Sequence, residues 1–265
     1  MNDEINKTTQ KFWQKWSIAF RVLPIVGIVA ILRYAIYVFD LELMELNALF
    51  TSLVAGTIFL IGFLISGVLS DYKESEKIPS ELASILRSLL DDAYTIYKSK
   101  GSETALEFIE YQKTLLFSLN NWFYKKEKTS SLLNKISKMN DIIIDFEKDG
   151  IQPNFLIKIK TEQNNIRKTI LRIDTIRDTD FVGSGYAIVE AMWIAIAFGL
   201  IIMKINPFYV SMFFTVIVMF LISYMFLLIK DLDNPFDYSV KGESGTEISL
   251  KPIRDFEIEL NDFKV

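Results

Sequence analysis

The sequence contains no cysteine and no histidine among its 265 residues. Without thiols there are no disulfides, cysteine nucleophiles or thiolate metal sites, and without imidazole there is no Ser-His-Asp triad or histidine-ligated metal. No motif arranges the remaining carboxylates for acid–base or metal chemistry. A net charge of −4 offers no basic surplus for nucleic acid. We therefore predict a protein that is not an enzyme and holds no resident cofactor.

What the sequence does contain is long apolar stretches. Residues 48–70 are 23 uncharged residues, which form about 34 Å of helix, enough to cross a hydrocarbon core of ~30 Å. Residues 207–229 are equally long and uncharged. Residues 17–39 and 186–203 are also apolar, with two arginines in the former and one glutamate in the latter. These four stretches predict four transmembrane helices.

The segment between the second and third spans is polar and rich in helix formers. Leu82, Ile85, Leu86 and Leu89 recur at three- and four-residue spacing, which is typical of an amphipathic helix. The sequence thus predicts an all-α membrane protein with four transmembrane helices and a large cytoplasmic helical insert between spans 2 and 3. The predicted parts are an N-terminal interfacial segment (1–16), spans 1 and 2 (17–70), the helical domain (71–182), spans 3 and 4 (183–230) and a C-terminal tail (231–265).

Basic residues near the span ends predict the orientation. Lys11, Lys15 and Arg21 flank the first span, whereas the link at 40–47 contains neither Lys nor Arg. Lys204 in the second link argues slightly the other way. By the positive-inside rule, both termini and the helical insert are predicted to lie in the cytoplasm of a multi-pass cell-membrane protein.

Two stretches of this sequence carry recognisable motifs. The exit of the second span, SDYKESEKIPSEL, places Glu76, Ile78 and Pro79 in a Glu-x-hydrophobic-Pro pattern. After the fourth span comes the Asn-Pro-Phe of residues 234–236, followed by DYSVKGE and SLKPIRDFE. In both motifs, and in its order of spans, insert and tail, the sequence resembles the bestrophin channel superfamily, and more closely its bestrophin-like domain family.

This resemblance implies an ion channel, with five identical subunits placing their second spans around one axis. Most animal bestrophins pass anions, such as chloride, and some bacterial relatives pass cations, so selectivity stays open. The implied partners are the lipid bilayer, permeating ions and further copies of the chain. The second span then forms a hydrophobic neck that gates by dewetting, unless its side chains only pack against lipid and helices. When the family's pattern is aligned without gaps on Pro79, the resemblance implies a neck of Val54, Ile58 and Gly62, with Ile65 extending the same face. If the helix is rotated by one residue, Phe59 and Phe63 line the pore instead.

Glu190 is the only acid well inside a span. Intramembrane carboxylates are costly and usually face a partner or water. We expect Arg21 to be that partner, either as a structural pair or as part of gating. Simple snorkelling of Glu190 toward the interface is the other reading.

The resemblance raises the question of whether the chain binds calcium. Animal bestrophins bind it with a dense acidic cluster after Asn-Pro-Phe, which is reduced here to Asp237 and Glu243. Asp231, Asp233 and Asp237 are the candidate oxygen ligands. Their spacing does not form an EF-hand, and a tight turn after a helix explains them equally well.

Two other functions fit the same pattern of spans. A membrane-anchored sensor or scaffold would use the helical cytoplasmic domain to bind a protein partner and would conduct no ions. A transporter would show saturable turnover and inverted repeats, which the sequence does not display.

Overall fold

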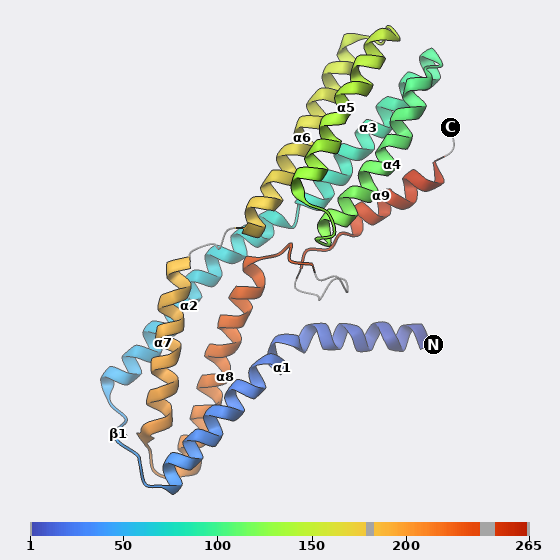
Figure 1. Ribbon diagram of the computed structural model, residues 1–265. Coiled ribbons are helices and arrows are strands. Elements are labelled where there is room, and N and C mark those ends of the chain that lie inside the picture. The colour runs from blue at the N-terminus through green and yellow to red at the C-terminus, as the bar shows by residue number, and fades with distance from the viewer. Residues whose placement is uncertain (1, 179–182, 239–246, 264–265) are drawn as a thin grey trace. The chain divides into compact units, whose positions relative to one another are not determined.

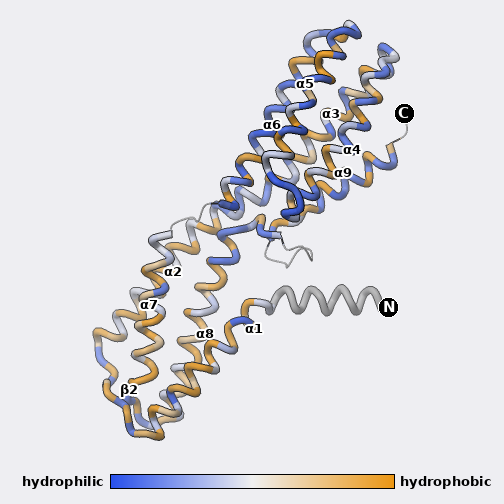
Figure 2. Tube along the Cα trace, viewed as in Figure 1, coloured by the Kyte–Doolittle hydropathy of each residue, from blue (hydrophilic) through white to orange (hydrophobic). Residues whose placement is uncertain are grey.

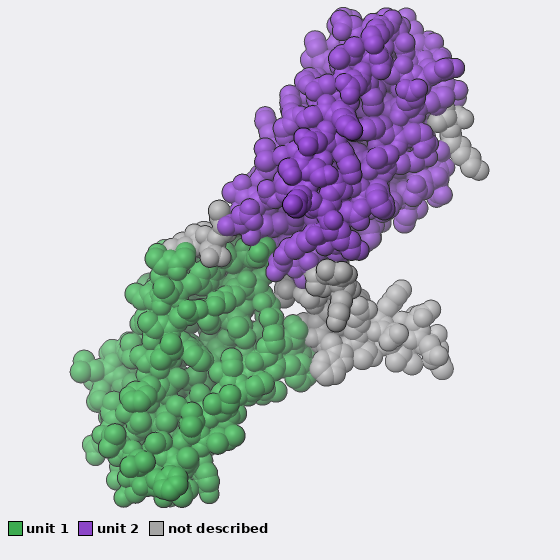
Figure 3. All heavy atoms as spheres, viewed as in Figure 1, with its two compact units in different colours: residues 1–72, 180–234 green, residues 73–179, 235–265 purple. Residues whose placement is uncertain are grey.

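The computed structural model describes residues 2–178, 183–238 and 247–263, with side chains from residue 16 onward. Contacts divide the chain into two compact units (Figure 3), each described here by itself. Each unit combines two separate segments of the chain. The membrane unit comprises residues 1–72 and 180–234, and the helical unit comprises residues 73–179 and 235–265.

The membrane unit is built from long, apolar helices (Figures 1 and 2). Four candidate membrane-spanning segments are present in the described part of the chain, as the sequence predicts. The second span runs five residues beyond its predicted end at Ser70, because the helix formers that follow it contain no breaker before Pro79. The helices are α1 (Asn2–Val38), α2 (Ala48–Ser75), α7 (Gly183–Ile202) and α8 (Phe208–Asp233).

All four helices contribute to one buried core in this unit. Gly199 of α7 makes room for the ring of Phe50 on α2, because a Cβ added at Gly199 would overlap that ring. Small residues at helix contacts are the usual means of close packing in membranes. One fully buried residue from each helix illustrates the core: Val22, Ile61, Ile196 and Ile222.

The two links at one end of the membrane unit pair with each other. β1 (Met44–Glu45) and β2 (Met203–Lys204) form a two-stranded parallel ladder. The Leu43 amide also donates to the Ile202 carbonyl at 3.0 Å. This pairing satisfies backbone groups that would otherwise lack partners where the helices end. Sequence periodicity does not predict this pairing, since two-residue strands are too short to show any.

The helical unit is a bundle whose helix ends are visible in the sequence. Gly101 and Gly150 adopt positive φ angles of 63° and 68° just after two of the helices, a conformation that glycine adopts without a Cβ penalty. Pro153 begins the next helix, where its missing N–H costs nothing. The helices are α3 (Ile78–Lys100), α4 (Glu103–Phe123), α5 (Thr129–Lys148), α6 (Pro153–Asp178) and α9 (Lys251–Asp262).

The C-terminal helix α9 belongs to this bundle. The sequence predicts a polar C-terminal tail at residues 231–265, and within it the structure packs α9 against α3 and α4. Ile253, Phe256 and Leu260 are completely buried there. These three positions lie on one face of the helix, since they are spaced by three and four residues. Helix α9 therefore contributes to the core of the helical unit.

We expect Leu86→Asp to unfold or loosen the helical unit. Leu86 is 1% exposed on α3, and an unpaired carboxylate buried there costs several kcal/mol. The matched control is Ser84→Asp, which places the same charge on an exposed position of α3. Circular dichroism and size-exclusion chromatography report the result. Equal melting temperatures for the two variants would contradict a core position for Leu86.

Candidate functional site

One face of α2 is exposed in the single chain and differs in composition from the other exposed helix faces. Its two largest members, Phe59 and Phe63, are 77% and 68% exposed. The rest are mostly Gly, Ala or Ser, spaced by three and four residues so that they form one stripe. The stripe consists of Ser52, Ala55, Gly56, Phe59, Gly62, Phe63, Ser66, Leu69 and Ser70.

The exposed faces of α1 and α8 are built from larger side chains. Long aliphatic and aromatic groups are what a helix presents to lipid tails. The α2 stripe combines small and hydroxyl-bearing residues with two projecting aromatic rings, whereas the described exposed face of α7 carries Ser184 and several alanines with one such ring, that of Phe198. The large exposed residues on α1 and α8 include Leu23, Ile28, Ile31, Phe213, Phe214, Ile217 and Leu221.

The residues predicted to form a neck fall on two sides of α2. Val54, Ile58 and Ile65 are partly buried and pack against the core of the membrane unit. Gly62 is exposed and lies in the stripe, with nothing within 4 Å of the position a Cβ would take. The rotated alternative, Phe59 and Phe63, is exposed. In the single chain, Phe59 and Phe63 thus lie on the exposed side of α2, whereas Ile58 is partly buried.

Four charged side chains pair near the end of α8, in a different combination from the one predicted. Arg21 of α1 donates to both carboxylate oxygens of Asp231, with Nη1 to Oδ1 at 3.1 Å. Lys230 Nζ lies 2.8 Å from Glu190 Oε1. The prediction that Arg21 pairs with Glu190 is therefore wrong. The adjacent opposite charges at 230 and 231 offer each of the two a nearer partner, and the Arg–Asp pair gains bidentate geometry.

The acidic residues considered as calcium ligands have other partners. Asp231 binds Arg21, and Asp237 forms an ion pair with Lys125 in the helical unit. Within the described residues, no three acidic side chains gather as a ligand set. Asp233 is part of no such set, and Glu243 lies outside the described residues.

A buried arginine, Arg33, joins four segments of the membrane unit. Its side chain is fully buried. From α1 it forms an ion pair with Glu42 of the first link and donates to the Ile201 carbonyl of α7 at 3.4 Å. On α8 it donates to Ser211 Oγ at 3.0 Å and lies over the Phe208 ring at 5.4 Å. Such a centre escapes sequence analysis because its partners are distant along the chain.

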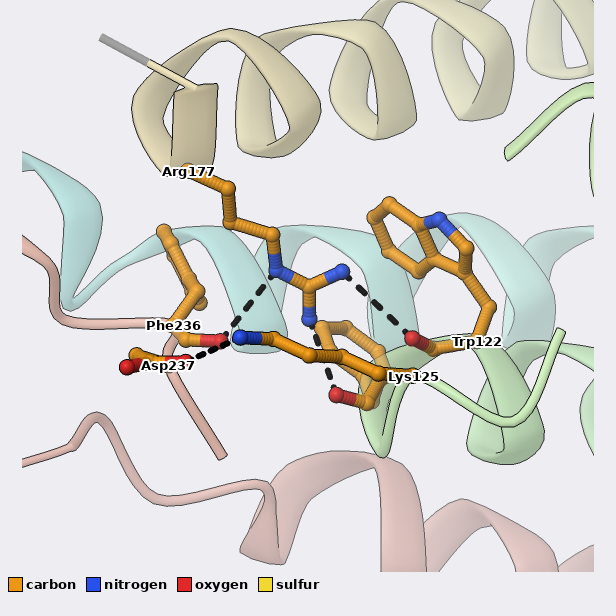
Figure 4. Close-up of polar contacts among 6 residues, drawn as sticks. Trp122, Lys125, Arg177, Phe236 and Asp237 are labelled. Atoms are coloured by element: carbon orange, nitrogen blue, oxygen red, sulfur yellow. Dashed lines mark hydrogen bonds and ion pairs between the residues drawn. The ribbon is translucent and has the colours of Figure 1, made fainter. Parts of the chain in front are cut away.

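Arg177 occupies a comparable position in the helical unit, at the end of α6 (Figure 4). Its guanidinium lies 4.4 Å from the ring centroid of Trp122 and donates to three backbone carbonyls. Burial lowers the pKa of Arg177 below its usual value, a shift opposed by Tyr238 and nearby aspartates. The three carbonyls belong to Phe236 (3.2 Å), Trp122 (3.4 Å) and Phe123 (3.0 Å).

We expect Arg177→Lys to lower the stability of the helical unit by about 1–3 kcal/mol, because an ammonium cannot serve three carbonyls and stack at once. A melting-temperature decrease of several degrees should result, measured by circular dichroism. Arg172→Lys is the control on the same helix, since Arg172 makes one exposed ion pair, with Glu74. Equal decreases for both variants would show that the carbonyl contacts contribute little.

Comparison with known proteins identifies structures with the same architecture. No family model and no curated protein sequence matches the chain, but solved structures do. A bacterial bestrophin homolog from Klebsiella pneumoniae has a TM-score of 0.72 at 16% identity, over 92% of this chain and 97% of that one. The chain has the bestrophin fold. A variant of that homolog with one isoleucine changed to alanine gives 0.73 at 16% identity, over 93% and 98%. A membrane protein variant gives 0.71 at 16% identity, over 93% and 98%.

The bestrophin fold confirms the resemblance drawn from two short motifs. Both motifs lie where the chain passes from one unit to the other, near residues 73–79 and 234–236. Ile78 and Pro79 are buried at the start of α3. Phe236 is also buried, and its carbonyl accepts from Arg177. Both motifs therefore lie at places where the chain changes from one unit to the other, and they contribute buried residues to the helical unit.

Proposed function

We propose that this chain is a subunit of a bestrophin-like ion channel and not an enzyme. In the proposed assembly, five copies surround one axis in the cell membrane and α2 from each copy lines the pore. The observation that carries the proposal is the exposed α2 stripe. Small and hydroxyl-bearing residues leave room for water along a pore, whereas projecting aromatic rings narrow it. The bestrophin fold, shared over more than nine-tenths of the chain, supports the same arrangement.

We assign the neck to Phe59 and Phe63, the rotated alternative. Their exposure supports this choice, since a pore-lining side chain has no partner in its own subunit. Val54, Ile58 and Ile65 act as packing residues that hold α2 on the rest of the membrane unit. Gly62 lies between the two aromatic positions and leaves space for the rings to rotate.

Ion conduction by the purified protein in planar bilayers is the direct test of this proposal. We expect discrete currents whose reversal potential under a salt gradient gives the charge selectivity. The assembly is tested in parallel by the native mass, which should equal five copies of the 30.6 kDa chain. A protein that stays folded in lipid but passes no ion would support the sensor or scaffold function instead.

The orientation of the channel is a separate prediction. Single cysteines at Glu45 and Ser137, both exposed, are informative because the native chain contains none. We expect impermeant maleimide added to intact cells to leave position 137 unlabelled, since the helical unit is assigned to the cytoplasm, and to label position 45. Glu42 in the same link is left unchanged, because it pairs with the buried Arg33. Labelling of position 137 from outside would invert the topology.

A further inference from the structure

The membrane unit has a half-open hollow between α1, α7 and α8 with a volume of about 220 Å³. This is roughly the volume of seven water molecules in the liquid. Inside it, Trp193 Nε1 donates to Ser223 Oγ at 2.9 Å, so these two polar groups satisfy each other. The remaining inner wall is carbon, and apolar cavities take apolar guests in preference to water. That wall is formed by Ile25, Ile194, Phe226 and Leu227.

An ion pair stands at the rim of this hollow. Glu190 lines it directly, and Lys230 lies 2.8 Å from Glu190 and 4.6 Å from the ring centroid of Phe226. Both side chains are about half exposed. Among the described residues, Glu190 Oε2 has no hydrogen-bond partner, and Lys230 uses one of its three N–H groups for Glu190. The rim thus offers one free acceptor and free donors, side by side.

The depth of the rim suits a lipid headgroup. Glu190 lies seven residues inside α7 and Lys230 three residues from the end of α8, which places their Cα atoms about 5–10 Å from the helix ends. Their side chains reach further toward the interface by snorkelling. An apolar hollow below a zwitterionic rim matches a molecule with an acyl chain and a zwitterionic head.

We infer that this hollow binds a phospholipid whose headgroup carries a primary ammonium, as in the phosphatidylethanolamine class. One acyl chain fills the hollow, the phosphate accepts from Lys230, and the ammonium donates to Glu190. A choline headgroup has no N–H to donate, and a glycerol headgroup has no positive charge for Glu190. The site depends on the membrane location of the spans and not on ion conduction.

Trp193 provides a reporter inside the hollow. The chain has four tryptophans, so Trp13, Trp16 and Trp122 are changed to phenylalanine and Trp193 is kept. Phosphatidylethanolamine with brominated acyl chains, which quenches indole fluorescence on contact, is added to this protein in detergent. We expect saturable quenching at a low molar ratio of lipid to protein. Brominated phosphatidylcholine and phosphatidylglycerol should need about tenfold more lipid, the loss expected from one charge-assisted hydrogen bond.

Three variants separate the site from general lipid contact. Lys230→Gln and Glu190→Gln should each raise the quenching midpoint about tenfold. Ile25→Phe fills the hollow and should abolish saturable quenching. The control Lys204→Gln removes an exposed lysine at β2, remote in sequence from the rim, and should leave the midpoint unchanged. Size-exclusion profiles confirm that each variant is folded.

Three results would overturn the inference. Quenching that rises linearly and equally for the three lipids would indicate bulk contact only. No quenching at all would mean that the hollow is closed or filled by a second copy of the chain. Saturable quenching that ignores both rim substitutions would remove the proposed headgroup recognition.

Discussion

Replacing Phe63 with alanine should increase the single-channel conductance or open probability of the reconstituted protein. The Phe63 side chain projects from the exposed α2 stripe. In the proposed assembly, five copies of it would form a constriction that excludes water. Alanine at position 63 widens this constriction and lowers the free-energy barrier to its wetting. A barrier lower by about 1.4 kcal/mol corresponds to about tenfold faster passage. Currents in planar bilayers under one fixed gradient measure the effect.

Ile58→Ala is the matched control for the neck. Ile58 packs against the core of the membrane unit, so its truncation should cost about 2–5 kcal/mol of stability at most and leave conductance unchanged. The opposite result, currents altered by Ile58→Ala but not by Phe63→Ala, would restore the neck at Val54, Ile58 and Gly62. If neither variant alters the currents of the parent protein, α2 is not the pore wall.

Arg33→Met should destabilise the membrane unit more than any other single charge removal there. The Glu42 side chain is only 7% exposed, so the substitution leaves its carboxylate buried without a counter-charge. Losing one partner of a buried pair costs about 3–5 kcal/mol. A marked decrease in the thermal unfolding midpoint in detergent, followed by fluorescence-detected size exclusion, is the expected readout.

Two further variants attribute that loss to the buried pair. Arg21→Met breaks a pair whose arginine side chain is 49% exposed, and exposed pairs contribute about 1 kcal/mol or less. The double variant Arg33→Met with Glu42→Leu removes both buried charges and should recover most of the stability. Equal losses at positions 21 and 33, or no recovery in the double variant, would contradict the account.

The helices were predictable where a local signal marks them. The spans follow from their length without charge, and the bundle helices begin or end at Gly101, Gly150 and Pro153, as backbone chemistry requires. Helix α9 was also within reach, because Ile253, Phe256 and Leu260 follow one another at helical spacing after a proline. Its polar average composition concealed this face.

The side-chain partners were not predictable in the same way. Arg21 and Glu190 could each pair with more than one oppositely charged residue, and the choice depended on which helix surfaces face each other. The partners of Arg33 come from other segments of the membrane unit, and no sequence spacing connects them. The rotation of α2 is the clearest case, since Ile58 and Phe59 are neighbours in sequence and face opposite environments. Sequence spacing defines a stripe but not the direction in which it points.

The division of the chain into two interleaved units has a consequence for biosynthesis. During translation, α1 and α2 leave the ribosome first, and the bundle helices α3–α6 follow before the last two spans exist. The bundle then lacks helix α9, whose side chains cover an apolar face of α3 and α4, until the C-terminal part of the chain is made. A nascent chain arrested before residue 251 therefore carries an uncovered hydrophobic surface, which makes it a substrate for chaperones and quality-control proteases.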